Sequence, residues 1–268
     1  MKAPALSAER ETADAGMPVL EIRGLGKAFQ VNGSRHAVLD GISFNAGRGE
    51  LICLLGRSGC GKSTLLRILA GLIRPTSGDA LVEGEPIRGP GPDRCVVFQE
   101  DGLFPWLTVE ENIAFGMKSQ KAGKVAVREE VTRFLSLVGL SSFKDYLPRE
   151  ISGGMKQRVA LARVLILAPK VLLMDEPFGA LDSQTREEMQ DLLLHLWEQL
   201  SITVVFVTHD VGEALLLADR ILVIGGSPGR IEKELHVEIA RPRRREEKEL
   251  LLLMADLREL LRPCGVSS

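Results

Sequence analysis

The hydrophobic pattern along this chain alternates between two kinds of segment. Continuous apolar runs, which are typical of strands buried on both faces of a sheet, occupy residues 51–56 (LICLLG), 95–99, 170–176 and 202–210. Helical spacing of apolar positions occurs at residues 62–73, 108–140 and 185–200. Buried strands that alternate with helices predict an α/β fold, with a mostly parallel core sheet and helices on both of its faces.

The first part of the chain has a different pattern. Residues 18–31 (PVLEIRGLGKAFQV) alternate apolar and polar positions, which predicts an edge strand, and residues 36–50 predict a second strand with a turn. Residues 77–87 return to strand, and the turn cluster GPGPDR follows at 89–94. The lead, residues 1–17, lacks the apolar centre of a signal peptide, and we expect it to be disordered.

Residues 108–140 predict two helices with no strand signal between them. We therefore interpret the region from about residue 104 to residue 168 as an inserted helical subdomain. No apolar run approaches the roughly 18–20 residues that a membrane span needs. We expect a soluble chain, which can sit on a membrane by binding an integral partner.

Composition narrows the class of protein. The chain has 268 residues, of which 45% are hydrophobic and 26% charged, as in ordinary globular proteins. Its 34 lysines and arginines are balanced by 36 acidic residues, so a net charge of −2 gives no electrostatic footprint for nucleic acid. The four cysteines form no CxxC pair, which favours reduced thiols over a disulfide or metal framework.

The segment GRSGCGKS, residues 56–63, matches the phosphate-loop pattern G-x-x-x-x-G-K-[ST] between a buried strand and a helix. Its glycines let backbone N–H groups surround an anion, and the N-terminus of the helix adds partial positive charge. We expect Lys62 to reach the β and γ phosphates and Ser63 to ligate Mg²⁺. Cys60 is interpreted as a small filler, in preference to a redox role. The predicted nucleotide-binding residues are Gly56, Arg57, Ser58, Gly59, Cys60, Gly61, Lys62, Ser63 and Thr64.

Two adjacent acids, Asp175 and Glu176, follow the apolar run VLLM. The carboxyl end of a buried strand is where open α/β sheets place ligands. Adjacent strand residues point to opposite faces, so we expect different roles for the two acids. Asp175 would hold Mg²⁺, and Glu176 would act as general base toward the attacking water. The alternative is a polar strand end that makes a cap.

A second stretch, ISGGMKQR at residues 151–158, also has the small residues of an anion site at a helix start. With it, the order of motifs resembles the ATP-binding subunit of ABC transporters over about residues 18–230. The stretch is similar to the family signature LSGGQ followed by a basic residue and QR. Ile151 replaces leucine, and Met155 replaces glutamine, which removes an amide hydrogen-bonding group.

Other positions match the family one by one. Phe29 matches the aromatic residue that stacks on adenine, although an apolar strand residue would give the same pattern. Gln99 resembles the glutamine that touches Mg²⁺ and water, and Asp182 in GALD resembles the D-loop aspartate that faces a partner subunit. His209 in VTHD resembles the switch histidine that contacts the γ-phosphate. A lone histidine at a strand end is usually structural, but its place after the other motifs favours the functional role.

The resemblance implies a P-loop NTPase fold of ABC type. It adds an antiparallel β subdomain to the mostly parallel core and the inserted α-helical subdomain, and leaves residues 231–268 as a C-terminal strand and helix extension. It implies ATP and Mg²⁺ as cofactors, with Glu176, His209, Gln99 and Lys62 in catalysis and Ser63, Gln99 and Asp175 at the metal. It also implies a head-to-tail dimer, in which the second copy contributes Ser152, Gly153, Gly154, Met155 and Asp182.

The segments at residues 89–116 and 185–199 are similar to nitrate, sulfonate and taurine importer subunits. The resemblance therefore implies the ATP-hydrolysing motor of an importer for a small oxyanion or organosulfonate, peripheral on the cytoplasmic face of the cell membrane. A periplasmic or extracellular substrate-binding protein would act on it indirectly. The alternatives are an ABC subunit for another substrate, a non-transport ABC ATPase acting on nucleic acid, and a scaffold with a degenerate site.

Two further segments remain open between alternatives. The loop Leu103, Phe104, Pro105 and Trp106 carries aromatics that would be costly to expose without a partner, and the resemblance implies that it docks a helix of the membrane permease. The alternative is packing within the helical subdomain. The tail segment RPRRR, residues 241–245, could be a nucleic-acid or lipid patch. Because EEKE follows it, we favour a solvated turn before a last helix.

Overall fold

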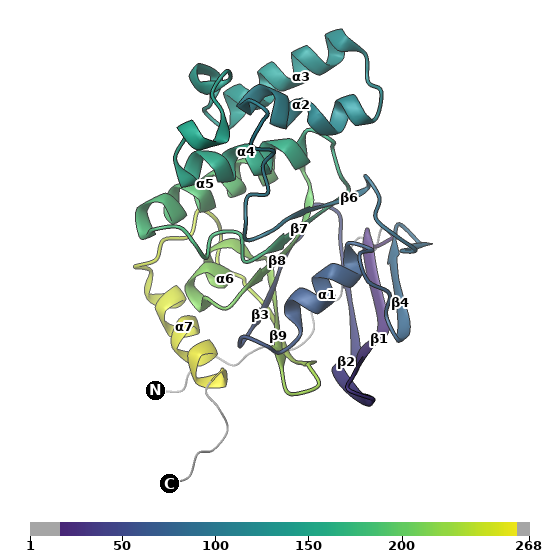
Figure 1. The fold of residues 1–268 in the computed structure, drawn as a ribbon. Helices are drawn as coiled ribbons and strands as arrows, with labels where there is room; N and C mark the ends of the chain where they lie inside the picture. Colours follow the sequence, from purple (N-terminus) through teal and green to yellow (C-terminus); the bar gives the residue numbers. More distant parts are fainter. Residues whose placement is uncertain (1–16, 262–268) are drawn as a thin grey trace.

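Two β-sheets of different kinds form the frame of the molecule (Figure 1). The computed structural model describes residues 17–261, so the predicted lead lies outside the described residues except for Met17. The larger sheet has the strand order β10-β9-β3-β8-β7-β6. Its strands are β3 (Leu51–Gly56), β6 (Arg94–Val97), β7 (Val171–Asp175), β8 (Thr203–Thr208), β9 (Arg220–Gly225) and β10 (Arg230–His236).

Five strands of this sheet are parallel, and only β10 runs antiparallel, beside β9. Alternate residues of the central strands enter two separate hydrophobic cores. In β3, Leu51, Cys53 and Leu55 face one core, whereas Ile52 and Leu54 face the other. Because both faces are buried, these strands have the continuous apolar runs that identified them in the sequence.

The smaller sheet is antiparallel, with the order β2-β1-β4-β5. Its strands are β1 (Leu20–Val31), β2 (Ser34–Ala46), β4 (Ser77–Val82) and β5 (Glu85–Pro86). The prediction that the first strand lies at a sheet edge is wrong, because β1 pairs with β2 on one side and β4 on the other. Its polar positions are explained instead by one solvent-facing side. The strand predicted over 77–87 is a hairpin, turned at Glu83 and Gly84, which both have positive φ.

The small sheet and α1 (Lys62–Leu69) cover one face of the large sheet. The other face is covered by α4 (Gly153–Leu165), α5 (Ser183–Leu200) and α6 (Val211–Leu217). Helices therefore lie on both faces as predicted, but part of one face is covered by strands. This arrangement is the predicted fold class, a mostly parallel core with an antiparallel β subdomain.

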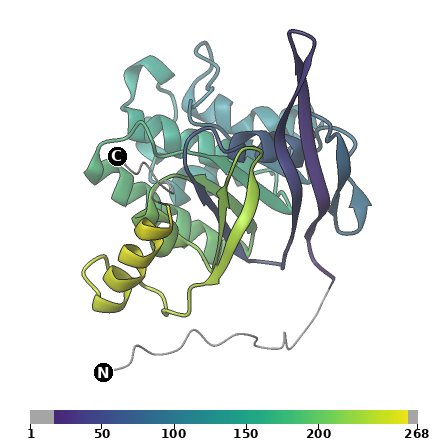
Figure 2. The same cartoon turned by 90° about the horizontal axis from the view of Figure 1, so that it is seen from below.

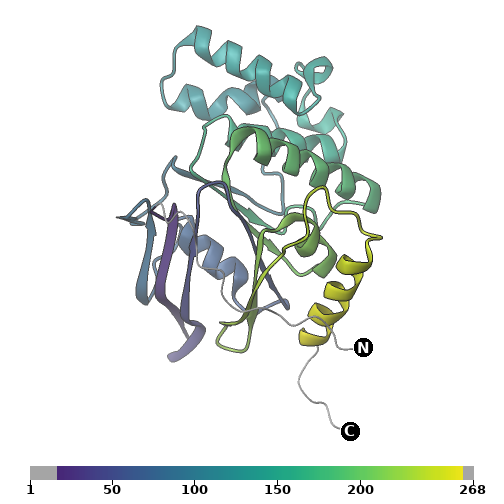
Figure 3. The ribbon, with the colours of Figure 1, turned by 180° about the vertical axis from the view of Figure 1, so that it is seen from behind.

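The helices α2 (Val109–Ser119) and α3 (Lys124–Leu137) stand with α4 at one end of the molecule, beyond β6 (Figures 1 and 3). They are the two helices expected within residues 108–140. Thr108 begins α2 with a capping box, in which its hydroxyl accepts from Glu111 N while Glu111 accepts from Thr108 N. The last described helix, α7 (Lys248–Leu260), packs beside α6, on the opposite side of the molecule from the β1–β2 hairpin (Figure 2).

Within residues 17–261, no helix combines the length and apolar character that crossing a membrane requires.

The turn between β9 and β10 packs closely against the phosphate loop. Gly229 N donates to Val38 O at 2.9 Å, and Asp40 N donates to Gly229 O at 3.0 Å, which ties this turn to β2. A Cβ at Gly229 would overlap the carbonyl oxygen of Cys60, inside the phosphate loop. Only glycine therefore allows the turn and the loop to approach this closely.

We expect Gly229→Ala to destabilise the protein by about 1–3 kcal/mol, because the new methyl group forces the turn away from the loop. Gly89→Ala is the matched control, since a Cβ there meets no atom within 4 Å. Urea unfolding of both variants measures the free energy of unfolding. Equal stability of the two variants would contradict the close approach at Cys60.

Candidate functional site

The phosphate loop connects β3 to α1 at the carboxyl edge of the large sheet. Gly59 and Gly61 adopt φ values of 85° and 98°, which side chains with a Cβ rarely accept. Gly61 is the N-cap of α1 and has no side chain to occupy the helix end. The first N–H groups of α1 therefore remain available to an anion, and the helix dipole adds partial positive charge there.

Lys62 is the first residue of α1 and is almost fully buried, with 3% exposure. Its ammonium group donates to Gly56 O at 2.8 Å and to Arg57 O at 3.0 Å, so the side chain folds back over the loop. The sulfur of Cys60 also lies 4.0 Å from this group. A buried cation held by neutral groups is well suited to exchange these contacts for a phosphate oxygen. Cys60, within the loop, is buried, in agreement with a filler role.

The loop serine and the first acid of the pair are in direct contact. Ser63 Oγ donates to Asp175 Oδ1 at 2.9 Å, although 112 residues separate them. Burial raises the pKa of Asp175, and the hydrogen bond from Ser63 opposes that rise. A hydroxyl and a carboxylate side by side are hard oxygen donors of the kind that Mg²⁺ prefers, and Mg²⁺ commonly needs only one or two protein ligands beside substrate phosphates.

The second acid points elsewhere. Glu176 Oε2 lies 2.9 Å from His209 Nδ1, which joins the ends of β7 and β8. The predicted division of direction between Asp175 and Glu176 is present, but strand alternation does not cause it. β7 ends at Asp175, and Glu176 has the left-handed φ of 46°, which is uncommon for a residue with a side chain. Strained backbone of this kind is found at functional sites.

Two predicted residues lie at the margin of this cluster. Gln99 is exposed two residues beyond β6, with its Nε2 3.6 Å from where a Cβ on Gly179 would stand. It makes no hydrogen bond with Ser63 or Asp175 among residues 17–261. Phe29 is 38% exposed near the end of β1, with Lys27 Nζ 4.7 Å from its ring centroid. A half-exposed aromatic ring on this strand is available for stacking.

The ISGG segment leads into the amino end of α4. Ser152 is the N-cap, and its Oγ accepts from Met155 N at 3.3 Å. Gly154 lies against α5, because a Cβ there would stand 2.5 Å from Thr185 Cγ2. No hydrogen bond in the described part of the chain joins residues 152–155 to residues 56–64. Met155 packs its side chain partly against the larger core, so its apolar character has a use here.

Asp182 is the N-cap of α5. Its carboxylate accepts from Thr185 N at 3.0 Å and from Thr185 Oγ1 at 2.7 Å. These bonds, the backbone one first, lower the pKa of Asp182, so it stays ionised. Within this chain the residue therefore has a capping role, and its side of α5 is exposed to solvent.

The predicted docking loop divides into a buried and an exposed part. Leu103 is buried in the larger core with 9% exposure, so its assignment to a partner-facing surface is wrong. Trp106 is 71% exposed, and Phe104 packs between the rings of Trp106 and Phe115. Leu103 points inward because it is the apolar anchor that fastens the loop to the helical subdomain.

Sequence reasoning missed two residues that shape this loop. Asn112 of α2 is fully buried; its Oδ1 accepts from Phe104 N at 2.9 Å, and its Nδ2 donates to the carbonyls of Phe104, Leu107 and Thr108. Arg163 of α4 donates to Asp101 O and Gly102 O and lies over the Phe104 ring. A polar residue on the apolar face of the predicted helix was the available signal for Asn112.

The signature helix is also tied to the acidic pair. Gln157 of α4 is buried, and its Nε2 donates to Pro177 O at 2.8 Å, immediately after Glu176. Gln157, the glutamine of the QR pair in the signature, thus has a structural partner in the same chain.

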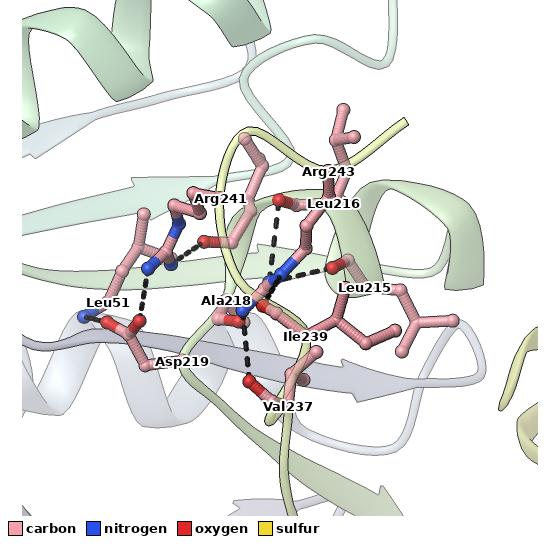
Figure 4. A network of polar contacts seen from close by, with 10 residues as sticks. Leu51, Leu215, Leu216, Ala218, Asp219, Val237, Ile239, Arg241 and Arg243 are labelled. Atoms are coloured by element: carbon pink, nitrogen blue, oxygen red, sulfur yellow. Dashed lines mark hydrogen bonds and ion pairs between the residues drawn. The ribbon is translucent and has the colours of Figure 1, made fainter. Parts of the chain in front are cut away.

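The tail segment RPRRR is a turn before α7 in which two arginines are bound by the fold. Arg243 is 7% exposed and is surrounded by backbone carbonyls, and Arg241 pairs with Asp219 (Figure 4). The expected turn before the last helix is present, and Pro242 and Arg244 are exposed in it. Its solvated character holds only in part, because backbone carbonyls and Asp219 bind Arg241 and Arg243.

Comparisons with known proteins place the chain in a family. Residues 39–179 match the family described as ABC transporter. The chain is 47% identical over 220 residues to the nitrate import ATP-binding protein NrtD of Synechocystis sp., covering 82% of this chain and 83% of that one. It is 47% identical over 225 residues to the taurine import ATP-binding protein TauB of Roseobacter denitrificans, with 84% of each chain covered.

A solved structure is also similar to this chain. A dimeric ATP-binding cassette in a post-hydrolysis state, bound to ADP and Pi, superposes with a TM-score of 0.71 at 30% identity, covering 82% of this chain and 100% of that chain.

We expect Asn112→Asp to lower the free energy of unfolding by roughly 2–5 kcal/mol, because a buried carboxylate cannot donate to three carbonyls. Gln120→Glu makes the same amide-to-acid change at an exposed position just beyond α2, where we expect a change of at most about 0.5 kcal/mol. Urea unfolding compares them. A tolerated Asn112→Asp would show that Asn112 does not hold the loop.

Proposed function

The chain belongs to the ABC transporter family, and from this premise we propose that it is the ATP-hydrolysing subunit of an importer for a small oxyanion or organosulfonate. The proposal rests on two side-chain contacts that lie at the same edge of the large sheet. Ser63 contacts Asp175 at 2.9 Å, and Glu176 contacts His209 at 2.9 Å, beside the phosphate loop. Each pair has the chemistry that one part of ATP hydrolysis requires.

The phosphate loop binds the triphosphate. Backbone N–H groups at the start of α1 receive the phosphate oxygens, and Lys62 turns from Gly56 O and Arg57 O to the β and γ phosphates. Ser63 and Asp175 would hold Mg²⁺, with Gln99 completing its ligands, and the ion would neutralise charge between the phosphates. Phe29 would stack on adenine from β1.

Glu176 acts as the general base. Its carboxylate orients the attacking water and accepts a proton from it as the bond to the γ-phosphorus forms. His209 holds this carboxylate through Nδ1 and presents the rest of its ring toward the γ-phosphate. Glu176 and His209 follow different strands, β7 and β8. Loss of the γ-phosphate could therefore move the end of β8 relative to the end of β7.

The proposed site needs two chains. Ser152 and Gly153 are exposed at the N-terminus of the 13-residue helix α4, and a Cβ at Gly153 would meet no atom within 4 Å. Nothing within residues 17–261 therefore requires glycine at position 153, whereas close approach of a phosphate from a second copy would. Met155 adds apolar packing in place of an amide, and Asp182 stands at the same surface.

The conformational change that accompanies hydrolysis would be transmitted to a membrane permease through the aromatic loop, residues 103–106. Trp106 and Phe115 are 71% and 42% exposed and are joined through the ring of Phe104, which gives an exposed apolar patch that favours a partner. Phe104 and Pro105 complete this patch, while Leu103 anchors it from inside. We place the subunit on the cytoplasmic face of the membrane, with a separate binding protein selecting the cargo.

The substrate class rests on the relatives. Nitrate and the sulfonate group of taurine are both small anionic groups with oxygens on nitrogen or sulfur, and the chain is equally similar to a nitrate and a taurine import protein. A nucleic-acid ATPase is disfavoured by the net charge of −2 and by the internal pairing of the RPRRR arginines.

We expect Glu176→Gln to bind ATP with nearly unchanged affinity and to lose about 10²–10⁴-fold in kcat, because the amide cannot accept the proton. Glu198→Gln, on the exposed side of α5, is the charge-matched control and should keep full turnover. Phosphate release and nucleotide binding measure the two quantities. Turnover of Glu176→Gln within a few-fold of Glu198→Gln would remove Glu176 from catalysis.

We also expect Ser152→Arg to prevent ATP-dependent dimerisation in the Glu176→Gln background, because the long side chain blocks the approach of a second copy. Ser136→Arg, at an exposed position of α3, is the control and should still dimerise. Gel filtration with and without ATP shows the result. A dimer that persists in Ser152→Arg would refute the two-chain site.

A further inference from the structure

The segment Arg241–Arg245 has no part in the function described so far. We call these five residues the arginine strap. They lie between β10 and α7 and contact α5 and the carboxyl end of α6, and Asp219 links them to Leu51 at the start of β3. Figure 4 shows Arg241 and Arg243 with Asp219 and Leu51. Three of the four arginines contact elements that surround the nucleotide site, and each holds a different one.

Arg243 binds the carboxyl end of α6. Its Nη1 donates to Leu215 O at 2.8 Å and Ala218 O at 2.6 Å, and its other nitrogens donate to Val237 O and Ile239 O. The last carbonyls of a helix have no partner within the helix and favour a positive charge. Burial lowers the pKa of Arg243 to about 10, so the guanidinium stays protonated at neutral pH.

Arg241 binds the connection from α6 to β9. It pairs with Asp219 through Nη1, donates to Leu217 O at 2.5 Å, and lies 4.4 Å from the ring centroid of Trp197 on α5. Asp219 in turn brackets Leu51: its Oδ2 accepts from Leu51 N, and its backbone N donates to Leu51 O. Leu51 is the first residue of β3, which leads directly into the phosphate loop.

Arg245 reaches the other end of α6 through two buried side chains. Its Nη2 donates to Gln190 Oε1 at 2.5 Å, and Gln190 Nε2 donates to Glu213 Oε1 at 2.9 Å. Gln190 and Glu213 are 0% and 6% exposed. Glu213 lies in the first turn of α6, where Asp210 caps its backbone N–H.

These contacts fix the backbone on both sides of His209. The Thr208 hydroxyl accepts from Asp210 N at 3.0 Å, and Asp210 Oδ1 accepts from Glu213 N at 3.0 Å, so the residues on both sides of His209 are linked to the first turn of α6. His209 itself has a side chain 61% exposed, and its partner in the described chain is Glu176. Its position therefore depends on the backbone around it.

We propose that the arginine strap is a positioning element for His209, acting by fixing both ends of helix α6. A helix of seven residues has little stability of its own and takes its position from what packs against it. Arg243 holds the carboxyl end of α6, and Arg245 holds the amino end through Gln190 and Glu213. The proposal rests on the proposed function, because it assigns to His209 a role in hydrolysis.

A purely structural strap makes a different prediction. If residues 241–245 only fastened α7 to the domain, weakening Arg245 would lower thermal stability and leave His209 and kcat unchanged. If the strap positions His209, the histidine must move even in the folded protein. Arg245 is the best residue to change, because Arg243 is buried among carbonyls and its removal risks the fold.

The first test observes His209 directly in the nucleotide-free protein. The chain has four histidines, so imidazole NMR signals of ¹³C-histidine-labelled protein can be assigned with His209→Ala. We expect Arg245→Met to shift or broaden the His209 signal and to leave that of His36, on β2, in place. Arg244→Met is the matched control, because Arg244 is exposed and its side chain makes no hydrogen bond or ion pair within residues 17–261. An unmoved His209 signal in Arg245→Met would overturn the proposal.

The second test measures ATP hydrolysis by the full chain. We expect Arg245→Met to lose about ten-fold in kcat with the KM for ATP within about two-fold, because misplacement of a catalytic group affects the chemical step. Arg245→Lys should recover part of the loss, and Arg244→Met should match the wild type. Wild-type kcat in Arg245→Met would overturn the strap's role. A wild type that hydrolyses no ATP would instead overturn the proposed function, while the NMR result would stand.

Discussion

The site depends on the register in which β3, β8 and β7 run side by side. Leu55 pairs with Thr208, and Asp175 pairs with Val207, so the three strands end at the same edge of the sheet. Parallel strands place their carboxyl ends together, and ligands bind there. Because of this register, Ser63 reaches Asp175 and Glu176 reaches His209 across long separations in sequence. A shift by one residue would turn every side chain of a strand to the opposite face.

The remainder of the fold holds this edge in place with buried polar side chains directed at backbone carbonyls. Loops and helix ends leave carbonyls that no sheet or helix satisfies, and a buried carbonyl needs a partner. Gln157 donates a hydrogen bond to the carbonyl of Pro177, and Asn112 donates to carbonyls around Phe104. Arg243 donates to the carbonyls at the end of α6. These residues connect the nucleotide edge to the signature helix, the aromatic loop and the C-terminal extension.

The same connections give the proposed motor a route for movement. Gln157 links the signature helix α4 to the residue after Glu176, and Arg163 of the same helix holds the loop of Phe104. A change at the γ-phosphate would therefore reach the exposed aromatic patch through one rigid helix. Packed elements move as units because their interfaces have few stable arrangements.

The sequence by itself determined the parallel core, the phosphate loop, the acidic pair and the helical insertion, because these depend on local patterns. An apolar run or a glycine spacing is visible within ten residues of chain. The tertiary structure alone decided that β1 is a central strand, that Leu103 is buried, and that Arg241 and Arg243 of RPRRR bind backbone carbonyls of the fold. Each of these depends on which distant residue supplies a strand, a core or a carbonyl. Such partners leave no mark in the local pattern, because an alternating strand or a basic pentamer looks the same whether or not another element covers it.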